Sequence, residues 1–358
     1  MSIDDEWNSF LDSGNIDTIY SGQMCQTIDV PECEELYIST KTKVLFLNQP
    51  IDIYNVFWKL PVINYCSPED GIVKKQMKVV CNSEYEYNEY TSKLQNLKYF
   101  TENIIKQINN PTARRIKYKD ERKITIGMSK KDIMNCRGKV KNAFYNCFAI
   151  IVRFLFEGEY REIHIKVFNT GKLEIPGIQD DNMMIYALEK LCSLMTEITQ
   201  IPVTYNKTDI QNVLINSNFK CNYYINRDKL FNILKYKYNI HSLFDACSYP
   251  GIQCKYYENS NNNGICTCST KCGFREKSNV KKSKLKCVEV SFMIFRTGSI
   301  LIVGHCNEDV LHKVYMFVKK MLLAEFKEIH IPIENPLYKT KKKKKKLKKK
   351  TIMVKINK

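Results

Sequence analysis

Apolar residues recur at helical spacing in two distant parts of the chain, around Met184–Met195 and around Val310–Met321. Each of these predicted helices follows two alternating segments that are joined by a Phe-x-Thr-Gly sequence, which is typical of a β-hairpin. The hairpin sequences are Phe168–Gly171 and Phe295–Gly298. The order of strand, hairpin and helix therefore predicts a diverged internal duplication. Two copies indicate one pseudo-symmetric body, because a solenoid usually needs at least three repeats.

The segments before each hairpin complete two similar halves. The first half opens with alternation over residues 40–47 and a short helix over residues 52–60, which ends at Pro61. Alternating residues 148–155 then lead into its hairpin. The second half opens with a strand over residues 210–214 and a helix over residues 228–236. Each half thus predicts a strand, a helix, several antiparallel strands and a second helix, which is an α+β fold.

The remaining segments are two insertions and two tails. The first repeat, residues 37–200, holds an insertion over residues 64–139, with a helix near 91–108; the second repeat, residues 201–330, holds a Cys-rich insertion over residues 258–287. Residues 1–36 form an acidic arm that we expect to be flexible. Residues 331–358 form a basic tail, whose run KTKKKKKKLKKK cannot pack because like charges repel.

Charge and composition narrow the class of partner. The formal net charge is +18, although residues 1–40 contain nine carboxylates and no Lys or Arg. Such an excess indicates a polyanionic partner, while a coding bias toward Lys, Asn, Ile and Tyr explains part of it equally well. The sequence has no apolar run of membrane-spanning length and no signal-peptide pattern, so we expect a soluble intracellular protein with no membrane partner. We expect the 15 cysteines to be mostly reduced.

Several short motifs, in the same order in both halves, resemble the TATA-box-binding protein (TBP) family. They are Phe148-Ala149-Ile150 and Val167–Gly171 in the first half, and Ile210–Ile225, Tyr249-Pro250-Gly251 and Ile294–Gly298 in the second. The resemblance implies a TBP-like saddle with two pseudo-symmetric halves, each made of a curved antiparallel sheet and two helices. Insertions and tails are added to this plan. The large insertions and the AT-rich coding bias resemble versions of the family in large DNA viruses.

The resemblance also implies a function and a set of DNA-binding residues. Proteins of this family bind A/T-rich promoter DNA in the minor groove, bend it by inserting aromatic wedges, and recruit RNA polymerase and a B-type initiation factor. The matching wedges are Phe148 and Phe168 in the first half, with Tyr249 and Phe295 in the second. Asn212 matches a central base-reading residue, and its counterpart falls near Thr40. Further candidates for phosphate contact are Lys172 and Lys255.

Other positions depart from the family pattern. Pro176 and Val303 stand where the family has a groove-facing Thr, so two polar contacts are missing. In the second insertion, four cysteines at irregular spacing fit either tetrahedral zinc or free thiols. They are Cys266, Cys268, Cys272 and Cys287. By the resemblance, this insertion replaces a loop that meets the B-type initiation factor.

The sequence contains no catalytic motif, so we expect a binding protein and not an enzyme. It has no HExxH, Walker A, nucleophile-elbow or dinucleotide-binding sequence. Two alternatives remain open. One is a saddle-fold scaffold of a transcription complex that does not bind DNA sequence-specifically, and the other is a DNA-repair accessory module. For the main hypothesis, the expected location is the nucleus, a viral factory or the virion.

Overall fold

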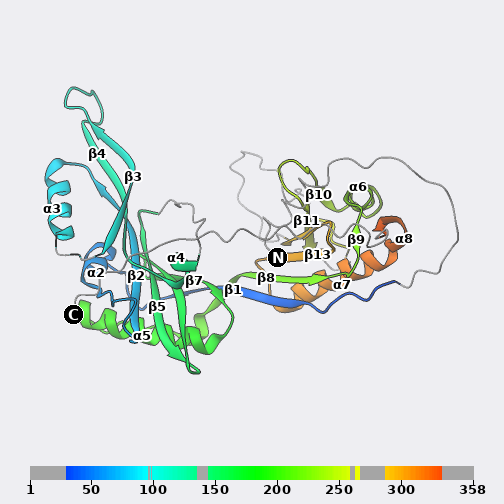
Figure 1. Cartoon of the computed structure of the whole chain (residues 1–358), viewed down its shortest axis with the longest axis horizontal. Helices are drawn as coiled ribbons and strands as arrows, with labels where there is room; N and C mark the ends of the chain where they lie inside the picture. The colour runs from blue at the N-terminus through cyan, green and yellow to red at the C-terminus, as the bar shows by residue number, and fades with distance from the viewer. Residues whose placement is uncertain are drawn as a thin grey trace. The chain divides into compact units, whose positions relative to one another are not determined.

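The computed structural model describes residues 30–95, 97, 99–134, 144–258, 263–266 and 287–332. Most of the acidic arm and almost all of the basic tail lie outside these residues. The chain divides into two compact units. The first-half unit comprises Thr42–Gln211, and the second-half unit joins the segment that ends at Lys41 to the residues from Asn212 onward. We describe each unit by itself (Figure 1).

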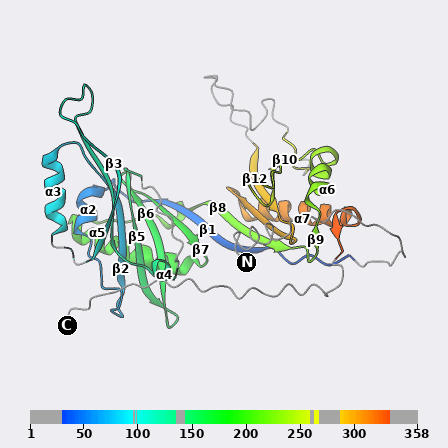
Figure 2. The same ribbon diagram turned by 45° about the horizontal axis from the view of Figure 1, so that its top comes forward.

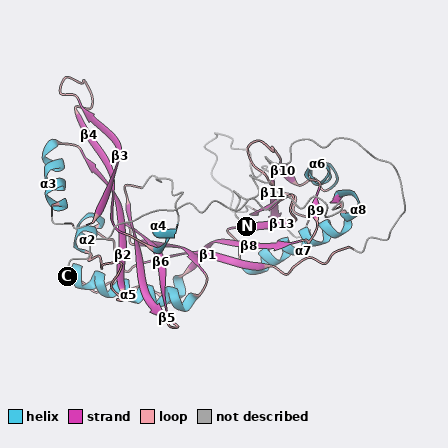
Figure 3. Cartoon of the chain, viewed as in Figure 1, coloured by secondary structure: helices cyan, strands magenta, loops and turns pink. Residues whose placement is uncertain are grey.

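The first-half unit is an antiparallel sheet with helices packed against it (Figure 3). Its strands are β1 (Tyr37–Phe46, from Thr42 onward), β2 (Gly71–Cys81), β3 (Phe100–Asn109), β4 (Tyr118–Gly127), β5 (Cys147–Phe156), β6 (Glu159–Phe168) and β7 (Lys172–Ile178). Its helices are α2 (Ile53–Lys59), α3 (Glu84–Leu94), α4 (Lys130–Met134) and α5 (Asp181–Thr199). The strands follow the order β1-β7-β6-β5-β2-β4-β3.

The second-half unit repeats most of this plan. Its sheet contains the first residues of β1 with β8 (Gln211–Lys220), β10 (His241–Leu243), β11 (Ile252–Glu258), β12 (Val288–Ile294) and β13 (Ser299–Gly304). A small second sheet pairs β9 (Tyr224–Ile225) with β14 (His330–Ile331). Its helices are α6 (Arg227–Asn232), a π-helical turn (Ile233–Lys237), α7 (Glu308–Ala324) and α8 (Phe326–Ile329). A 3-10 turn (Lys207–Asp209) lies at the end of the first-half unit.

The strand order confirms the internal duplication. The second-half strands run β8-β13-β12-β11-β10, which corresponds strand for strand to β1-β7-β6-β5-β2 in the first half. β4 and β3 continue the first-half sheet beyond β2 and have no counterpart in the second half. The expected fold class, two α+β repeats of the TBP type with insertions, is therefore confirmed by topology.

The two Thr-Gly hairpins adopt the same backbone conformation. Gly171 and Gly298 have φ angles of 80° and 78°, and each donates its N–H to the carbonyl of the Phe three residues earlier at 3.0 Å. The carbonyl of each glycine accepts an N–H at 2.9 Å, from Leu47 in one half and Cys221 in the other. Positive φ favours glycine. A Cβ atom would also lie 2.4 Å and 2.3 Å from backbone oxygens of Gln49 and Tyr223.

A separate hydrophobic core supports each sheet. In the first half, the predicted stripe of α5 is buried, and Asp180 caps the helix by accepting from the N–H of Asn182. In the second half, α7 packs Val314 and Met321 into the core, and Asn307 accepts from the N–H of Val310. Both long helices therefore begin at a side-chain cap and cover one face of their sheet.

The first insertion is largely ordered and extends the first-half sheet. The helix predicted near residues 91–108 is wrong in position, since α3 spans Glu84–Leu94 and residues 100–109 form β3. Ser83 and Glu86 start α3: Ser83 Oγ accepts the N–H of Glu86 at 3.2 Å, and Glu86 Oε2 accepts the N–H of Asn82 at 2.7 Å. This pair is a variant of the capping box, in which the Glu side chain accepts from the residue before the N-cap. The paired β3 and β4 extend past α3 to a connecting loop (Figures 1 and 2).

The expectation of a flexible arm over residues 1–36 does not hold at its C-terminal end. Cys33 is buried in the second-half core. The N–H of Glu34 donates to the carbonyl of Lys220 at 2.8 Å, and the carbonyl of Glu34 accepts the hydroxyl of Tyr315 at 3.0 Å. These residues immediately precede the first repeat in our predicted boundaries, yet they pack onto the second half. No helix in the described part of the chain is long and apolar enough to cross a membrane.

Candidate nucleic-acid interface

In each unit, one face of the sheet packs on the core and the other carries part-exposed residues. We call the latter the open face. In β8, Ile215, Ser217 and Phe219 are buried, whereas alternate residues from Asn212 to Asn218 are part-exposed. Side chains alternate along a strand, so these residues share the open face of the second half.

The open face of the second half is rich in amide and small polar groups. Strand register places Asn218 beside Leu301 and Asn216 beside Val303, and continues through Met293 and Ser291 of β12. Asn216 Nδ2 donates to Thr40 Oγ1 at 3.1 Å. The Asn212 Oδ1 atom is shielded from solvent and has no hydrogen-bond partner among the described residues. Amide groups of this kind can both donate to and accept from base edges.

The open face of the first half carries ion pairs at the corresponding positions. Lys166 lies beside Glu174 in the register and forms an ion pair with it at 2.5 Å. Lys74 pairs with Asp132 at 2.7 Å. His164 lies on the same face, and burial, together with the ammonium groups of Lys166 and Lys74, lowers its pKa to about 4. The imidazole is therefore neutral at physiological pH.

The predicted wedge pair of the second half comes together in the structure. The rings of Tyr249 and Phe295 lie 5.9 Å apart at an angle of 56°. Gly251 is close to both, since a Cβ atom on it would approach the Phe295 and Tyr249 rings to 3.0 Å and 3.1 Å. Tyr249 is part-exposed. A wedge that inserts into DNA is expected to be exposed, but Phe295 is only 3% exposed, so this part of the wedge assignment is wrong.

In the first half, Phe148 does not lie on the open face. Its side chain is fully buried in the core, and its ring lies 6.0 Å from that of Phe57 on α2. Phe168, by contrast, is part-exposed, with the Lys172 ammonium 5.5 Å from its ring centroid. Phe148 pairs with Val167 and therefore points to the same side as the buried residues of β5. The expectation that Phe148 is an exposed wedge is corrected on this ground.

Strand register gives Tyr145 the place that we assigned to Phe148. In the second half, Ile252 pairs with Ile294, so Gly251 stands opposite Phe295 and Tyr249 precedes Gly251 by two residues. In the first half, Cys147 pairs with Phe168, and the residue two positions before Cys147 is Tyr145. Tyr145 is 75% exposed. The family motif did not identify Tyr145. The number of residues between Tyr145 and Phe168 across the hairpin would have identified it.

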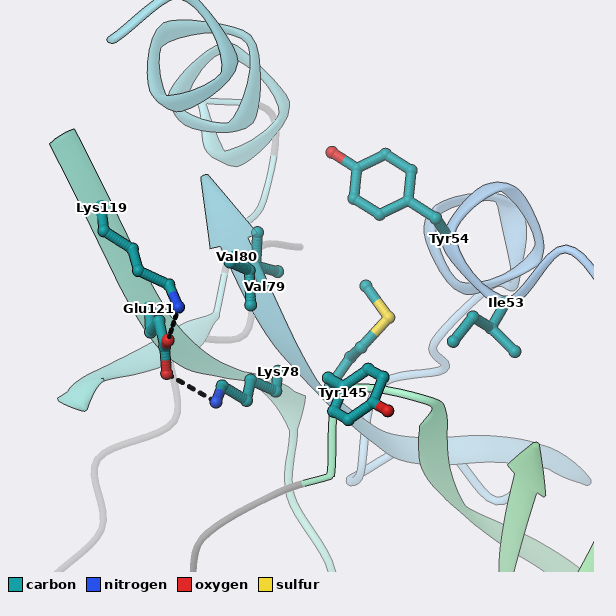
Figure 4. A pocket seen from close by; sticks show the side chains of 9 residues that line it. Ile53, Tyr54, Lys78, Val79, Val80, Lys119, Glu121 and Tyr145 are labelled. Carbon is teal, nitrogen blue, oxygen red and sulfur yellow. Dashed lines mark ion pairs between the residues drawn. The ribbon is translucent and has the colours of Figure 1, made fainter. Parts of the chain in front are cut away.

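Tyr145 also lines a cavity of about 430 Å³ at the end of the first-half sheet (Figure 4). The other lining residues are Ile53, Tyr54, Met77, Lys78, Val79, Val80, Lys119 and Glu121. Hydrogen bonds from Lys119 and Lys78 lower the pKa of Glu121 to about 2. Two ammonium groups thus share one carboxylate, at 2.8 Å and 2.6 Å, beside two tyrosine rings.

The other predicted DNA-binding residues lie at ordinary places on the two sheets. Thr40 accepts the hydrogen bond from Asn216. Lys172 contacts the Phe168 ring, and Lys255 forms an ion pair with Glu289 at 2.8 Å. Pro176 and Val303 are both part-exposed on strands β7 and β13. The DNA-binding role of all these residues stays a prediction.

Two of the four predicted zinc ligands lie within the described residues. The Sγ atoms of Cys266 and Cys287 are 3.9 Å apart, whereas Cys268 and Cys272 fall outside the described part of the chain. Nearby Cys254 is buried in the core, where burial raises the pKa of its thiol. Within the described residues, no three Cys, His, Asp or Glu side chains come together as a metal site.

Comparison with known proteins supports the resemblance found in the sequence. No protein-family model matches the chain. The chain is 27% identical over 211 residues to a TATA-box-binding protein-like protein of Acanthamoeba polyphaga mimivirus, a match that covers 54% of this chain and 52% of that protein. The chain thus spans about half the length of this relative. The similarity and the duplicated topology together support a resemblance to diverged TBP-like proteins.

Among solved structures, the chain is similar to TBP from Methanococcus jannaschii. The match covers 82% of this chain and 99% of that chain, with 9% sequence identity and a TM-score of 0.38. The resemblance to the TBP family rests on the motifs, the duplicated strand order and the mimivirus protein.

Proposed function

We propose that the protein is a TBP-like transcription initiation factor that binds A/T-rich promoter DNA through the minor groove and bends it. The observation that carries this proposal is the open face of β8, where three asparagines alternate with core residues. In the minor groove, A·T pairs present only hydrogen-bond acceptors, which the amide N–H groups of asparagine match. The excess of positive charge on the chain supplies sequence-independent attraction to the phosphates.

Bending in this proposal comes from one aromatic pair in each half. Tyr249 and Phe295 form the second-half pair, and Tyr145 takes the place of Phe148 beside Phe168 in the first. Inserting a ring between base steps costs a few kcal/mol of unstacking, which is offset by the additional protein surface that the bent duplex contacts. The buried Phe295 ring must move outward to insert. We therefore infer that bending is coupled to a rearrangement of the Tyr249–Phe295 contact.

Substitution of the amides tests the groove contact. Asn212→Ala with Asn218→Ala should weaken binding to an A/T-rich duplex by roughly thirtyfold or more, since two base contacts at about 1–3 kcal/mol each amount to at least about 2 kcal/mol. The matched control is Asn55→Ala with Asn232→Ala, two exposed asparagines on helices. Fluorescence anisotropy at fixed salt measures both. Equal affinities for the two double variants would contradict binding through the open face.

We further propose that RNA polymerase and a B-type initiation factor are recruited to the DNA-bound protein, with the second-half insertion as the contact for the initiation factor. The support is the TBP-like character of the chain and the position of the insertion between β11 and β12. A co-purification experiment with residues 259–286 replaced by a short Gly-Ser linker tests this. The expected result is loss of the initiation factor with DNA binding retained.

We also propose a structural zinc ion in this insertion. The approach of Cys266 and Cys287 to 3.9 Å favours it, because neighbouring thiolates of one tetrahedral zinc lie at about this separation. Elemental analysis of purified protein should find about one zinc per chain, reduced by Cys266→Ser or Cys287→Ser and unchanged by Cys66→Ser, whose exposed thiol lies in the other unit. Zinc-free protein would contradict it.

A further inference from the structure

The distal part of the β3–β4 hairpin is a second strongly basic surface, separate from the open faces. We call residues 104–117 the arm. The arm contains four cations, Lys106, Arg114, Arg115 and Lys117, and no carboxylate. All four side chains are exposed, and none of them forms an ion pair within the described residues. Most other lysines of this unit's sheet are neutralised, as Lys74, Lys78, Lys119 and Lys166 are.

The arm does not contribute to the core of the unit. The strand register shifts between Ile104 and Lys106, and almost every residue beyond that bulge is exposed on both faces of the ribbon. Ile104, Ile105 and Ile116 are 59%, 37% and 45% exposed. A two-stranded ribbon that exposes isoleucines and buries little is marginal by itself in water. These apolar side chains are expected to be covered when the arm binds its ligand.

The tip of the arm is nevertheless held in one conformation. The N–H of Asn110 donates to the carbonyl of Lys117 at 2.7 Å. The Asn110 Oδ1 atom accepts from the Thr112 N–H at 3.2 Å and from its hydroxyl at 2.8 Å. These bonds fix the turn that carries Pro111 and presents Arg114 and Arg115. An ordered basic turn loses less conformational entropy on binding than a flexible basic segment does.

We propose that this arm is a β-ribbon that binds duplex DNA, adding phosphate contacts beyond those of the open faces. Four unpaired cations complement the phosphate backbone, and a two-stranded ribbon fits the major groove, which is about 12 Å wide. At about 3.3 Å per residue, the seven positions from Ile104 to Asn110 reach roughly 20 Å, the length of about six base pairs. The exposed isoleucines and Pro111 contact sugars and base edges.

Substitution of the tip cations tests the arm. Arg114→Gln, Arg115→Gln and Lys117→Gln together should weaken binding to a 40-base-pair duplex roughly tenfold or more at low salt. They should also reduce the slope of log affinity against log salt by about 0.9 for each phosphate that the variant no longer neutralises. The control removes the same charge from exposed lysines on the helical side or in a loop of the same unit, with Lys59→Gln, Lys190→Gln and Lys207→Gln. Hydroxyl-radical footprints should shorten by about six base pairs for the arm variant alone.

The outcomes separate this proposal from the open-face proposal. If the arm variant and the control weaken binding equally, or neither changes the footprint, the arm is not a DNA contact. Weaker binding of the arm variant to single-stranded RNA or to anionic vesicles, with duplex affinity unchanged, would also overturn the proposal. The arm is assigned independently of the wedges. A Tyr249→Ala/Phe295→Ala protein should keep the arm-dependent salt slope even if it fails to bend DNA.

Discussion

The two halves share a strand order but differ in the chemistry of their open faces. Leu301 and Met293 of the second half occupy the register positions that Glu174 and Lys166 hold in the first. At these two positions the second half is apolar and the first half is ion-paired, and the second-half open face carries its own ion pair elsewhere, between Lys255 and Glu289. A carboxylate that faces DNA is repelled by phosphates, and a paired lysine must leave its partner to bind one. Under the proposed function, we therefore expect groove reading to be concentrated in the second half, with the arm adding charge to the first.

The largest expected effect tests whether the two hairpins are equivalent. Gly171→Ala and Gly298→Ala should each destabilise the protein by about 4 kcal/mol, because a Cβ atom would both strain the positive φ and overlap a backbone oxygen. Gly158→Ala is the matched control, since its φ is 78° but its Cβ position is open. It should cost only about 1 kcal/mol. Urea denaturation measures all three, and a Gly298 cost near that of Gly158 would break the equivalence.

His164 gives the first half a pH dependence that the corresponding residue of the second half cannot provide. The folded-state pKa of His164 is about 4, against 6.5 in the unfolded chain. Between these values the unfolded chain binds a proton that the folded chain does not, so stability falls as pH decreases from 6.5 to 4, by about 3 kcal/mol in total. The residue at the corresponding position is Ser291, so His164→Ser should remove this part of the slope. An unchanged slope in urea titrations would mean that another group causes it.

Exchanging the open-face residues tests the comparison directly. Lys166→Met with Glu174→Leu gives the first half the side chains of the second, and should strengthen duplex binding roughly tenfold, or about 1.4 kcal/mol. Net charge is unchanged by this pair of substitutions. The reverse exchange, Met293→Lys with Leu301→Glu, should weaken binding by at least as much. Both affinities are measured by anisotropy titration. Weaker binding after the first exchange and stronger binding after the reverse exchange would place groove reading in the first half.

The smallest effect concerns how β1 is tied to the two long helices. Lys43 pairs with Asp181 at the start of α5, and Lys41 pairs with Glu308 at the start of α7, both at 2.6 Å. Asp181→Asn should cost about 1 kcal/mol because the Lys43 side chain is only 9% exposed. Glu308→Gln should cost less than about 0.5 kcal/mol, as is usual for exposed pairs. Thermal unfolding measures both variants. An equal loss of stability in Asp181→Asn and Glu308→Gln would show that burial of the lysine does not matter here.

The repeat was predictable from sequence because its signals are local. The Thr-Gly turns require positive φ, and the helical stripes have a clear period, so the hairpins and long helices were expected where they occur. The start of helix α3 also has a local signal, since Ser83 and Glu86 have the spacing of a capping box. Residues 32–36 pack onto the second half through hydrogen bonds distant in sequence. Local patterns carry no information about such contacts.

The wedge assignment failed for a related reason. Phe148 matches the family motif by residue type, but the face on which a strand residue lies depends on register, and a shift of one residue moves it to the other face. In the β5–β6 hairpin, Cys147 and not Phe148 pairs with Phe168. This register leaves Phe148 in the core and Tyr145 exposed. The residue type of Phe148 does not reveal the register, which depends on the number of residues in the hairpin.

The most direct test of the account measures DNA bending by the two aromatic pairs. A duplex with an A/T-rich centre and a dye at each end reports bending by energy transfer. Tyr145→Ala/Phe168→Ala and Tyr249→Ala/Phe295→Ala should each reduce the bend, whereas Phe148→Leu, a core change, should leave it intact in folded protein. Full bending by both double variants, or loss of bending only with Phe148→Leu, would contradict the claim that Tyr145 replaces Phe148 at a DNA-binding open face.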